Sequence, residues 1–331
     1  MSESDILLEV RNLRTYFHTD DGVVRAVDGV SFDIKKRQII GVVGESGCGK
    51  SVTALSILRL IQSPPGRIEE GSILFHREHE TIDLAAVRPK GRKIREIRGA
   101  EISMIFQEPM RTLSPVYSIG YQIMESVQLH LNLNKKDAKE YAINMLHSVG
   151  MPDPEQRVNE YPHQLSGGMR QRAMIAMALS CNPKLLNADE PTTALDVTIE
   201  AQILELLKSL QREYHMAILF ITHDLGVISK MADIVLVMYL GQIMESASAV
   251  DLFQNPKHPY TQALLRSIPA MASAPKAKLE VISGSVPDPT VIITGCPFAP
   301  RCPHVHDKCD TKPGDTEVGP DHTVSCWLCR N

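Results

Sequence analysis

The sequence has no apolar run close to the roughly 20 residues that a membrane-spanning helix requires. Its strongest apolar stretches, AILFI at 217–221 and IVLVM at 234–238, have only the length of strands. The first residues, MSESDILLEV, lack the basic and apolar regions of a secretory signal. We therefore expect a soluble chain that works in the cytosol.

The chain also lacks a strong excess of charge, an internal repeat and a low-complexity segment. Its 331 residues carry a net charge of −4, so no global field attracts nucleic acid, which we do not expect as a partner. A chain of this length has room for two domains, or for one domain with an appendage.

Cysteine is scarce until the end of the chain. Only Cys48 and Cys181 occur before residue 296, whereas five cysteines follow: Cys296, Cys302, Cys309, Cys326 and Cys329. In a reducing cytosol, cysteines clustered in this way favour metal or cluster ligation over structural disulfides.

What is present is a pattern of strands alternating with helices. Residues 6–34 resemble antiparallel strands, and apolar runs predict buried strands at 38–44, 102–106, 184–189, 217–222 and 233–238. Helical patterns separate these runs, which indicates an α/β fold around a parallel sheet. We expect a helix at 51–61, a helical insert without strands at about 111–170, and an irregular appendage after residue 266, where proline and glycine become frequent.

GESGCGKS at 44–51 matches the phosphate-loop pattern between a strand and a helix. Glycine at 44, 47 and 49 lets backbone N–H groups surround phosphate oxygens. Lys50 would bridge the β- and γ-phosphates, and the Ser51 hydroxyl would hold Mg²⁺. The predicted phosphate contacts are Gly44, Glu45, Ser46, Gly47, Cys48, Gly49, Lys50, Ser51 and Val52. An ordinary glycine-rich turn is the less favoured interpretation, given the flanking strand and helix.

Cys48 lies inside this loop. The positive helix end and Lys50 could lower the pKa of its thiol, which would make it open to oxidation. The favoured interpretation is simpler: a small residue that fits.

Two further stretches carry polar groups at the ends of predicted elements. KLLNADEPT at 184–192 ends a strand with Asp189, a candidate Mg²⁺ partner, and Glu190, which could polarise a water attacking the γ-phosphate. LSGGM at 165–169 begins a helix, with Ser166 as N-cap and Gly167 and Gly168 exposing the first N–H groups. Each alone is usually an ordinary element end.

Together with MIFQEP (104–109), ALD (194–196) and FITHD (220–224), these motifs occur in an order that resembles the ATP-binding-cassette family, the ATPase subunits of ABC transporters. The resemblance covers roughly residues 6–265. It implies that Gln107 contacts Mg²⁺ and senses the γ-phosphate, and that His223 contacts the γ-phosphate. It further implies that Asp196 passes signals across a dimer and that Phe17 stacks on adenine. Neighbouring Tyr16 is also aromatic, but strand alternation lets only one of the two face the base.

The resemblance implies two cassettes that meet head to tail, with each ATP between the phosphate loop of one and the LSGGM of the other. Glu190, His223 and Lys50 would be catalytic, and Ser51, Gln107 and Asp189 would hold Mg²⁺. Residues 1–265 would form the nucleotide-binding domain, and residues 266–331 a C-terminal extension.

A transporter subunit is the favoured class, over a soluble translation-type ABC factor or a DNA-repair ABC protein. The latter classes usually carry two cassettes or a long coiled coil, which this chain lacks. NPKHPYTQALLRSIP (255–269) resembles the peptide/nickel importer branch, although it also reads as an amphipathic helix packed through Tyr260, Leu264 and Leu265. The branch implies import of di- or oligopeptides, or of nickel or another small solute. It also implies two membrane permeases, a second ATPase (a paralogue or the chain itself), an extracytoplasmic substrate-binding protein and a place at the cytoplasmic face of the membrane.

The spacing of Cys296, Cys302, Cys309 and Cys326 resembles a pattern that holds an iron–sulfur cluster in some members of this branch. Four thiolates can bind a [4Fe–4S] cluster. Zinc is the main alternative, because Cys₄ or Cys₃His suits it and His304, His306 and His322 are nearby. A set of unligated thiols is the third possibility, and Cys329 is left over.

Overall fold

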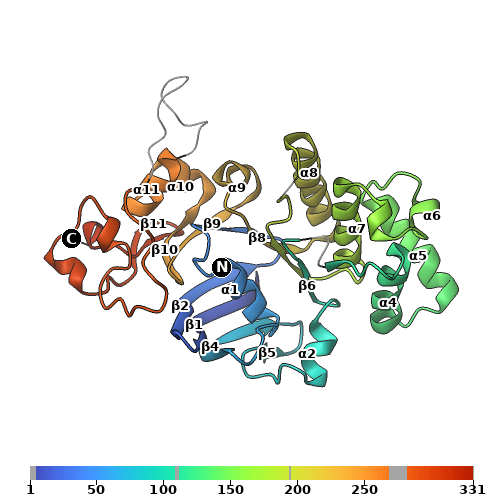
Figure 1. Ribbon diagram of the computed structural model, residues 1–331, viewed down its shortest axis with the longest axis horizontal. Coiled ribbons are helices and arrows are strands. Elements are labelled where there is room, and N and C mark those ends of the chain that lie inside the picture. Colours follow the sequence, from blue (N-terminus) through green and yellow to red (C-terminus); the bar gives the residue numbers. More distant parts are fainter. Residues whose placement is uncertain (1–4, 109–111, 194, 268–281, 331) are drawn as a thin grey trace. The chain divides into compact units, whose positions relative to one another are not determined.

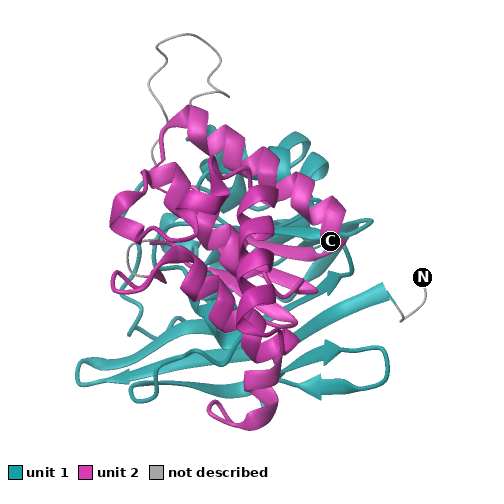
Figure 2. Ribbon diagram, turned by 90° about the vertical axis from the view of Figure 1, so that its right-hand side faces the viewer, with its two compact units in different colours: residues 1–86, 221–331 teal, residues 87–220 magenta. Residues whose placement is uncertain are grey.

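The computed structural model describes residues 5–108, 112–193, 195–267 and 282–330. The chain divides into two compact units, coloured separately in Figure 2: unit 1 contains residues 1–86 and 221–331, and unit 2 contains residues 87–220. Two residues of the predicted motifs lie outside the described residues: Pro109 of MIFQEP and Ala194 of ALD. No helix in the described ranges is long and apolar enough to cross a membrane.

Unit 1 contains an antiparallel sheet in the order β2-β1-β4-β5. Its strands are β1 (Ile6–Thr19), β2 (Gly22–Lys35), β4 (Gly66–His76) and β5 (Thr81–Asp83). A two-residue turn joins β1 to β2, and Thr19 pairs with Gly22 beside it. The pairing register, which runs from Ile6 opposite Lys35 to Thr19 opposite Gly22, confirms the antiparallel prediction for residues 6–34.

A second sheet in unit 1 has the order β11-β12-β10-β9-β3. β3 (Ile39–Val43) and β9 (Ile234–Tyr239) are parallel, and nearly every residue in them is buried, as their continuous apolar sequences predict. β10 (Gln242–Ser248) pairs antiparallel with β9. The helices of this unit are α1 (Lys50–Ile57), α9 (Leu225–Met231), α10 (Ala249–Gln254) and α11 (Pro259–Arg266).

Two details of unit 1 differ from the prediction. The helix expected at 51–61 ends at Ile57, because Leu58 caps it and Arg59 takes a left-handed conformation, φ +54°. The appendage is not wholly irregular: β11 (Thr316–Gly319) and β12 (His322–Val324) form a hairpin that adds to the edge of β10. Figure 1 shows this red segment beside β10. The hairpin was missed because its strands have only four and three residues.

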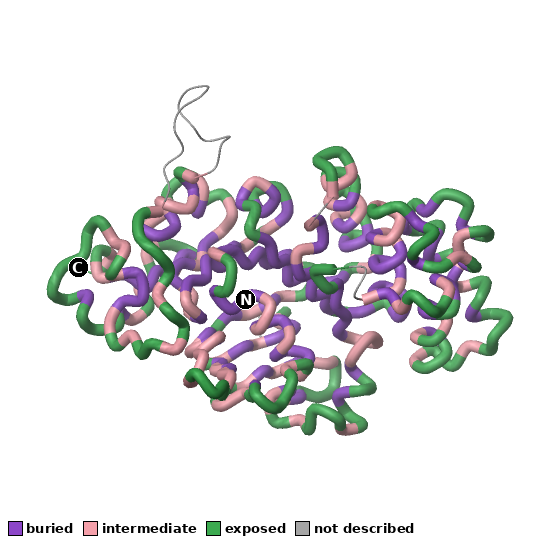
Figure 3. Tube along the Cα trace, viewed as in Figure 1, coloured by how far each residue is buried: buried purple, intermediate pink, exposed green. Residues whose placement is uncertain are grey.

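The other tail segments are short turns: η4 (Ala299–Arg301), η5 (Asp307–Asp310) and η6 (Trp327–Cys329). In Figure 3 the loops of this tail are largely exposed, whereas the strands of the sheet are buried. The tail is fixed by a few buried side chains, among them Phe298, Cys309 and Val324.

Unit 2 contains the strands β6 (Ile102–Ile105), β7 (Leu185–Asp189) and β8 (Ala217–Ile221), which ends at the unit boundary. β6 and β7 are parallel, and β8 is next to β7. The expected helical insert is present as α4 (Ile119–Leu131), α5 (Lys135–Ser148) and α6 (Pro154–Arg157), with no strand among its described residues. Longer helices follow at α7 (Gly167–Leu179) and α8 (Val197–Tyr214), and a short one, α2 (Arg92–Ile97), precedes β6.

Candidate functional site

The predicted phosphate loop joins β3 to α1, and its glycines are required by geometry. Gly44 has φ +152°, and a Cβ there would lie 2.1 Å from the carbonyl oxygen of Met238. Gly49 has φ +101°, and its Cβ would lie 2.0 Å from the carbonyl oxygen of Ala26. No side chain can occupy either position without moving the backbone. The loop is therefore held tightly against neighbouring strands of its own unit.

Lys50 begins α1 and is 6% exposed. Its Nζ donates to the carbonyl oxygens of Gly44 (2.8 Å) and Glu45 (3.0 Å), so the lysine folds back over the loop. A phosphate entering the loop would offer this ammonium a stronger, charged acceptor.

Cys48 is almost fully buried in the loop. Burial raises the pKa of its thiol, and this effect outweighs the opposing influence of Lys50. The structure thus favours the interpretation of Cys48 as a small, inert residue over that of a reactive thiol.

A cavity of about 140 Å³ lies beside the loop. Gly47 opens onto it, because a Cβ there would meet nothing within 4 Å. Val24 of β2 lines the same cavity, and it pairs with Phe17 of β1. Paired residues of antiparallel strands share a sheet face, so Phe17 lies next to a residue of the cavity wall. The hydroxyl of the neighbouring Tyr16 donates to Asp28 Oδ1 at 2.7 Å, and Asp28 also lines this cavity.

In unit 2, the structure brings Gln107 and Glu190 together. The amide of Gln107 donates to Glu190 Oε2 at 2.9 Å, and the Thr193 hydroxyl donates to the same oxygen at 2.8 Å. Glu190 has φ +46°, a left-handed conformation that a non-glycine residue adopts at a cost of order 1–3 kcal/mol. Asp189, at the end of β7, is 5% exposed. The strand thus ends in a buried carboxylate, followed in the sequence by one held by two donors.

Ser166 is the N-cap of α7, as predicted, and its hydroxyl accepts from the backbone N–H of Met169 at 3.3 Å. Gly167 has an ordinary φ, and a Cβ there would meet only Leu195 at 3.9 Å. Asp196 is the N-cap of α8, where one carboxylate oxygen accepts from Thr198 and Ile199. The family resemblance implies a signalling role for Asp196. This capping role was not predicted from the sequence.

His223 follows β8 and is exposed, directly before Asp224, the N-cap of α9. It belongs to unit 1 with the phosphate loop, whereas Gln107, Asp189, Glu190 and Ser166 belong to unit 2. The predicted roles of all these residues stay predictions.

The four predicted tail ligands are electrostatic neighbours. Burial is the largest cause that raises the pKa of Cys326, to about 12, and the charges of Cys329, Cys296 and Cys302 contribute in that order. Burial likewise raises the pKa of Cys296 and of Cys302. The charge of Cys309 adds a smaller increase to both. Within the described ranges, no group of three or more His, Cys, Asp or Glu side chains is placed to hold one metal ion.

His322, one of the zinc candidates, has another role. It is 5% exposed, and its Nε2 lies 2.8 Å from Oε1 of the fully buried Glu245. The same carboxylate accepts from the backbone N–H groups of Lys257 and His258. This network attaches the tail hairpin to β10 and to the start of α11.

Sequence reasoning missed the residues that support the phosphate loop from the C-terminal part of the chain. The Tyr260 hydroxyl accepts from the backbone N–H of Glu45 at 3.0 Å, and Arg301 forms an ion pair with the Glu45 side chain. The only available signal was HPYT, which indicated a packed helix; Tyr260 is indeed fully buried.

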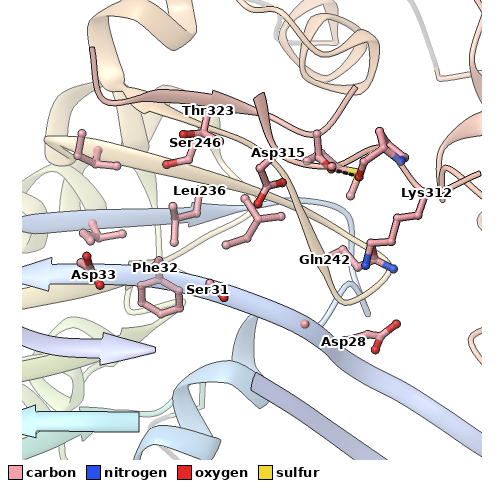
Figure 4. Close-up of a pocket in the computed structure, with 18 residues that line it drawn as sticks. Asp28, Ser31, Phe32, Asp33, Leu236, Gln242, Ser246, Lys312, Asp315 and Thr323 are labelled. Carbon is pink, nitrogen blue, oxygen red and sulfur yellow. Dashed lines mark hydrogen bonds between the residues drawn. The ribbon is translucent and has the colours of Figure 1, made fainter. Parts of the chain in front are cut away.

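A larger cavity of unit 1, of about 570 Å³, shares the lining residues Asp28 and Gln242 with the one beside the loop (Figure 4). Its walls come from β2, β9, β10 and the tail, with Asp28, Asp33, Lys312 and Asp315 among its charged lining residues. None of the predicted nucleotide or metal residues lines it.

Comparison with known proteins agrees with this arrangement. The family model described as ABC transporter matches residues 27–193, and the one described as oligopeptide/dipeptide transporter, C-terminal region, matches residues 244–309. The oligopeptide transport ATP-binding protein AppD of Bacillus subtilis is 53% identical over 97% of this chain and 96% of its own length. The dipeptide transport ATP-binding protein DppD of the same organism is 49% identical over 97% of this chain and 94% of its own length.

Solved structures show the same fold. The ATP-binding cassette MJ0796, in a dimeric post-hydrolysis state bound to ADP and Pi, has a TM-score of 0.64 and 24% identity. The match covers 73% of this chain and 98% of that one. CbiO1 from Clostridium perfringens, part of an ABC transporter complex, has a TM-score of 0.61 and 27% identity, and the match covers 76% of this chain and 92% of that one. With a phosphate loop of the required geometry and relatives of this similarity along nearly its whole length, the chain belongs to the ABC transporter ATP-binding proteins.

Proposed function

We propose that this ATPase drives an importer of di- and oligopeptides. The observation that carries the proposal is the phosphate loop, with its two obligatory glycines and buried lysine, in a chain whose residues 244–309 match the oligopeptide/dipeptide transporter region. The names of the relatives AppD and DppD support peptides over nickel or another small solute, and transport over a soluble ABC function.

The roles of the site residues follow the predicted chemistry. Lys50 and the loop N–H groups bind the phosphates, and the base occupies the cavity beside Gly47, next to Phe17 and Val24. Ser51, Gln107 and Asp189 supply the hydroxyl, amide and carboxylate oxygens that suit Mg²⁺. Glu190, held by Gln107 and Thr193, polarises the attacking water, and His223 contacts the γ-phosphate.

The second half of each site comes from another ATPase, either a copy of this chain or a paralogue. Ser166, Gly167 and Gly168 at the start of α7 present hydroxyl and N–H donors to the phosphates bound by that partner. Asp196 relays the closed state across the pair. ATP closes the pair and hydrolysis opens it, which is a ligand-driven two-state switch.

The motion is passed to two membrane permeases from a peripheral position at the cytoplasmic face of the membrane. The helical insert, α4 to α6, is the segment proposed to dock on them. A substrate-binding protein on the other side of the membrane would deliver the peptide.

Uptake by membrane vesicles containing the chain and its permeases tests the transported solute. We expect ATP-dependent uptake of labelled di- and oligopeptides, and none with a Lys50→Met variant. Nickel uptake without peptide uptake would instead select the alternative solute, and Mg²⁺-dependent ATPase activity that no permease changes would favour a soluble function.

We further propose that Cys296, Cys302, Cys309 and Cys326 hold a [4Fe–4S] cluster. Three of these partly or fully buried thiols, Cys296, Cys302 and Cys326, have raised pKa values and are poor nucleophiles, but a bound cationic centre stabilises thiolate forms. One zinc ion held by three cysteines and His322 is the poorer fit, because His322 is bonded to Glu245. When bound, the cluster would crosslink loops that have little core of their own.

Anaerobic purification with a visible spectrum and assays for iron, sulfide and zinc tests this second proposal. We expect broad absorption near ~400 nm and about four irons per chain, both lost in Cys302→Ser. A colourless chain with one zinc would replace the cluster by a structural zinc site and leave the ATPase assignment unaffected.

A further inference from the structure

Arg301 connects the cysteine-rich tail to the phosphate loop. It ends η4, directly before Cys302, and its side chain is only 4% exposed. Nη1 donates to Glu45 Oε2 at 2.7 Å and Nη2 donates to Glu45 Oε1 at 3.1 Å, so the pair is bidentate. The two residues are 256 positions apart in the sequence. A bidentate pair of this kind fixes the orientation of both groups.

The other contacts of Arg301 complete its hydrogen bonding. Nη1 also lies 3.3 Å from the Tyr239 hydroxyl, Nε donates to the carbonyl oxygen of Ser283 at 3.1 Å, and Nη2 reaches that of Ile282 at 3.4 Å. The guanidinium lies 5.8 Å from the centre of the Tyr239 ring. A lysine offers a single point charge and cannot reproduce this planar set of contacts.

On the other side of the pair, Glu45 is held at three points. Its carboxylate binds Arg301, its backbone N–H donates to the Tyr260 hydroxyl at 3.0 Å, and its carbonyl oxygen accepts from Lys50 Nζ at 3.0 Å. Glu45 is the second residue of the phosphate loop. The direction of its peptide groups therefore affects which N–H groups face the phosphates and where Lys50 rests.

The tail turn that carries Arg301 is itself fixed. Within it, Ala299 N–H donates to the Cys296 carbonyl and Cys302 N–H donates to the Ala299 carbonyl. Phe298, 1% exposed, packs with its ring centre 5.5 Å from that of Tyr239 and 5.3 Å from that of Tyr260. The turn thus lies between two of the clustered cysteines and is anchored on the residues that contact the loop.

The following inference rests on the ATP site proposed above. We propose that Arg301 is a positioning residue of that site: through Glu45, it holds the phosphate loop in the conformation that accepts nucleotide. The C-terminal extension is then part of the ATPase. Loss of order in the turn between Cys296 and Cys302 withdraws Arg301 and lowers the affinity for ATP.

The test measures equilibrium binding of a fluorescent ATP analogue, with Mg²⁺, to the full-length chain. The variants are Arg301→Met, Arg301→Lys, Glu45→Gln and the double variant Arg301→Met/Glu45→Gln. Arg330→Met is the matched control, because Arg330 is also a tail arginine stacked on an aromatic ring, at 5.0 Å from Trp327. Its Nε donates a hydrogen bond to the Thr316 hydroxyl, within the tail.

We expect Arg301→Met to raise the dissociation constant about tenfold, the loss typical of a buried charged hydrogen-bonded pair. Arg301→Lys should recover only part of it. The double variant should bind the ATP analogue within about twofold of the weaker single variant, because both substitutions break the same Arg301–Glu45 ion pair. In ATPase assays KM for ATP should rise while kcat changes little, which separates positioning of the loop from chemistry.

Melting curves for each variant keep folding separate from binding. If Arg301→Met does not fold, Glu45→Gln carries the test, because that side chain is 25% exposed. A folded Arg301→Met or Glu45→Gln chain that binds ATP as tightly as wild type would overturn the inference, as would an equal loss in Arg330→Met. A wild-type chain that binds no ATP would overturn the proposed function itself.

Cys302→Ser provides the second arm. We expect it to weaken nucleotide binding as Arg301→Met does, and to add nothing when the two are combined. Wild-type affinity in Cys302→Ser would show that Arg301 does not depend on the neighbouring cysteines and would remove that part of the inference.

Discussion

The two glycine-rich stretches of this chain, 44–51 and 165–169, look alike in the sequence but depend on glycine for different reasons. In the first, Gly44 and Gly49 have positive φ values and no space for a Cβ. In the second, Gly167 has an ordinary conformation and the nearest atom to its Cβ position is 3.9 Å away. The first stretch is shaped by its own unit. The second begins a helix that would tolerate alanine at position 167, so the glycine there suits a ligand from outside the chain.

The largest effect is expected from Gly44→Ala. The new Cβ would lie 2.1 Å from the Met238 carbonyl oxygen, so the loop must move, and ATP binding should fall by ~100-fold or more. Gly47→Ala is the control: its φ is +78°, but its Cβ meets nothing within 4 Å. Without nucleotide it should cost only the left-handed strain of about 1–2 kcal/mol, and its loss of ATP binding should be smaller than that of Gly44→Ala. Equal losses in the two variants, by nucleotide titration, would contradict the steric account of Gly44.

Glu190→Gln tests the chemistry that the first stretch serves. Removing the general base should lower ATP hydrolysis by ~10²-fold or more, while binding is retained. Thr193→Val removes one donor to the same carboxylate oxygen and should have a smaller effect. Single-turnover hydrolysis is the measurement, and a wild-type rate in Glu190→Gln would refute its assignment as the base.

The residues that support the first stretch, 44–51, should make the stability of the chain sensitive to acid. His258, 1% exposed, accepts the Tyr260 N–H through Nδ1, and Tyr260 in turn supports Glu45. Burial lowers the pKa of His258 to about 4. The unfolded chain, with a histidine pKa near 6.5, therefore binds more protons between pH 6.5 and 4, and stability is lost as pH falls through this range. The loss should approach about 3 kcal/mol at pH 4.

Denaturant unfolding at several pH values measures this slope. His258→Asn is the matched variant, because its side-chain oxygen can still cap the first turn of α11 but does not titrate. The Glu245 carboxylate, which accepts the His258 backbone N–H, and His322, which is bonded to it, remain in both proteins. An unchanged slope in His258→Asn would show that His258 is not the source of the acid sensitivity.

The sequence predicted most of the fold and its nucleotide chemistry, for physical reasons. Continuous apolar runs such as 39–43 and 217–221 form buried strands, and proline- and glycine-rich stretches mark the loops. Contacts between distant residues carry no such local signal. The ion pair between Glu45 and Arg301 joins two ordinary charged residues, and the hairpin of β11 and β12 is too short for alternation to show.

The smallest effect on the isolated chain is expected from Gly167→Ala. This variant also tests most clearly the difference between the two glycine-rich stretches. Alanine at the start of α7 should leave stability unchanged or raise it by up to about 1 kcal/mol, because alanine is the better helix former. Gly168→Ala is the control, since its Cβ would lie 3.0 Å from Ile199 and should cost stability within the chain itself. If the N–H groups at Gly167 bind the ATP of a partner, Gly167→Ala should bind nucleotide normally but hydrolyse it about tenfold more slowly when paired. Normal hydrolysis in the paired state, with unchanged melting, would mean that position 167 needs glycine neither for the chain's own fold nor for the partner's nucleotide.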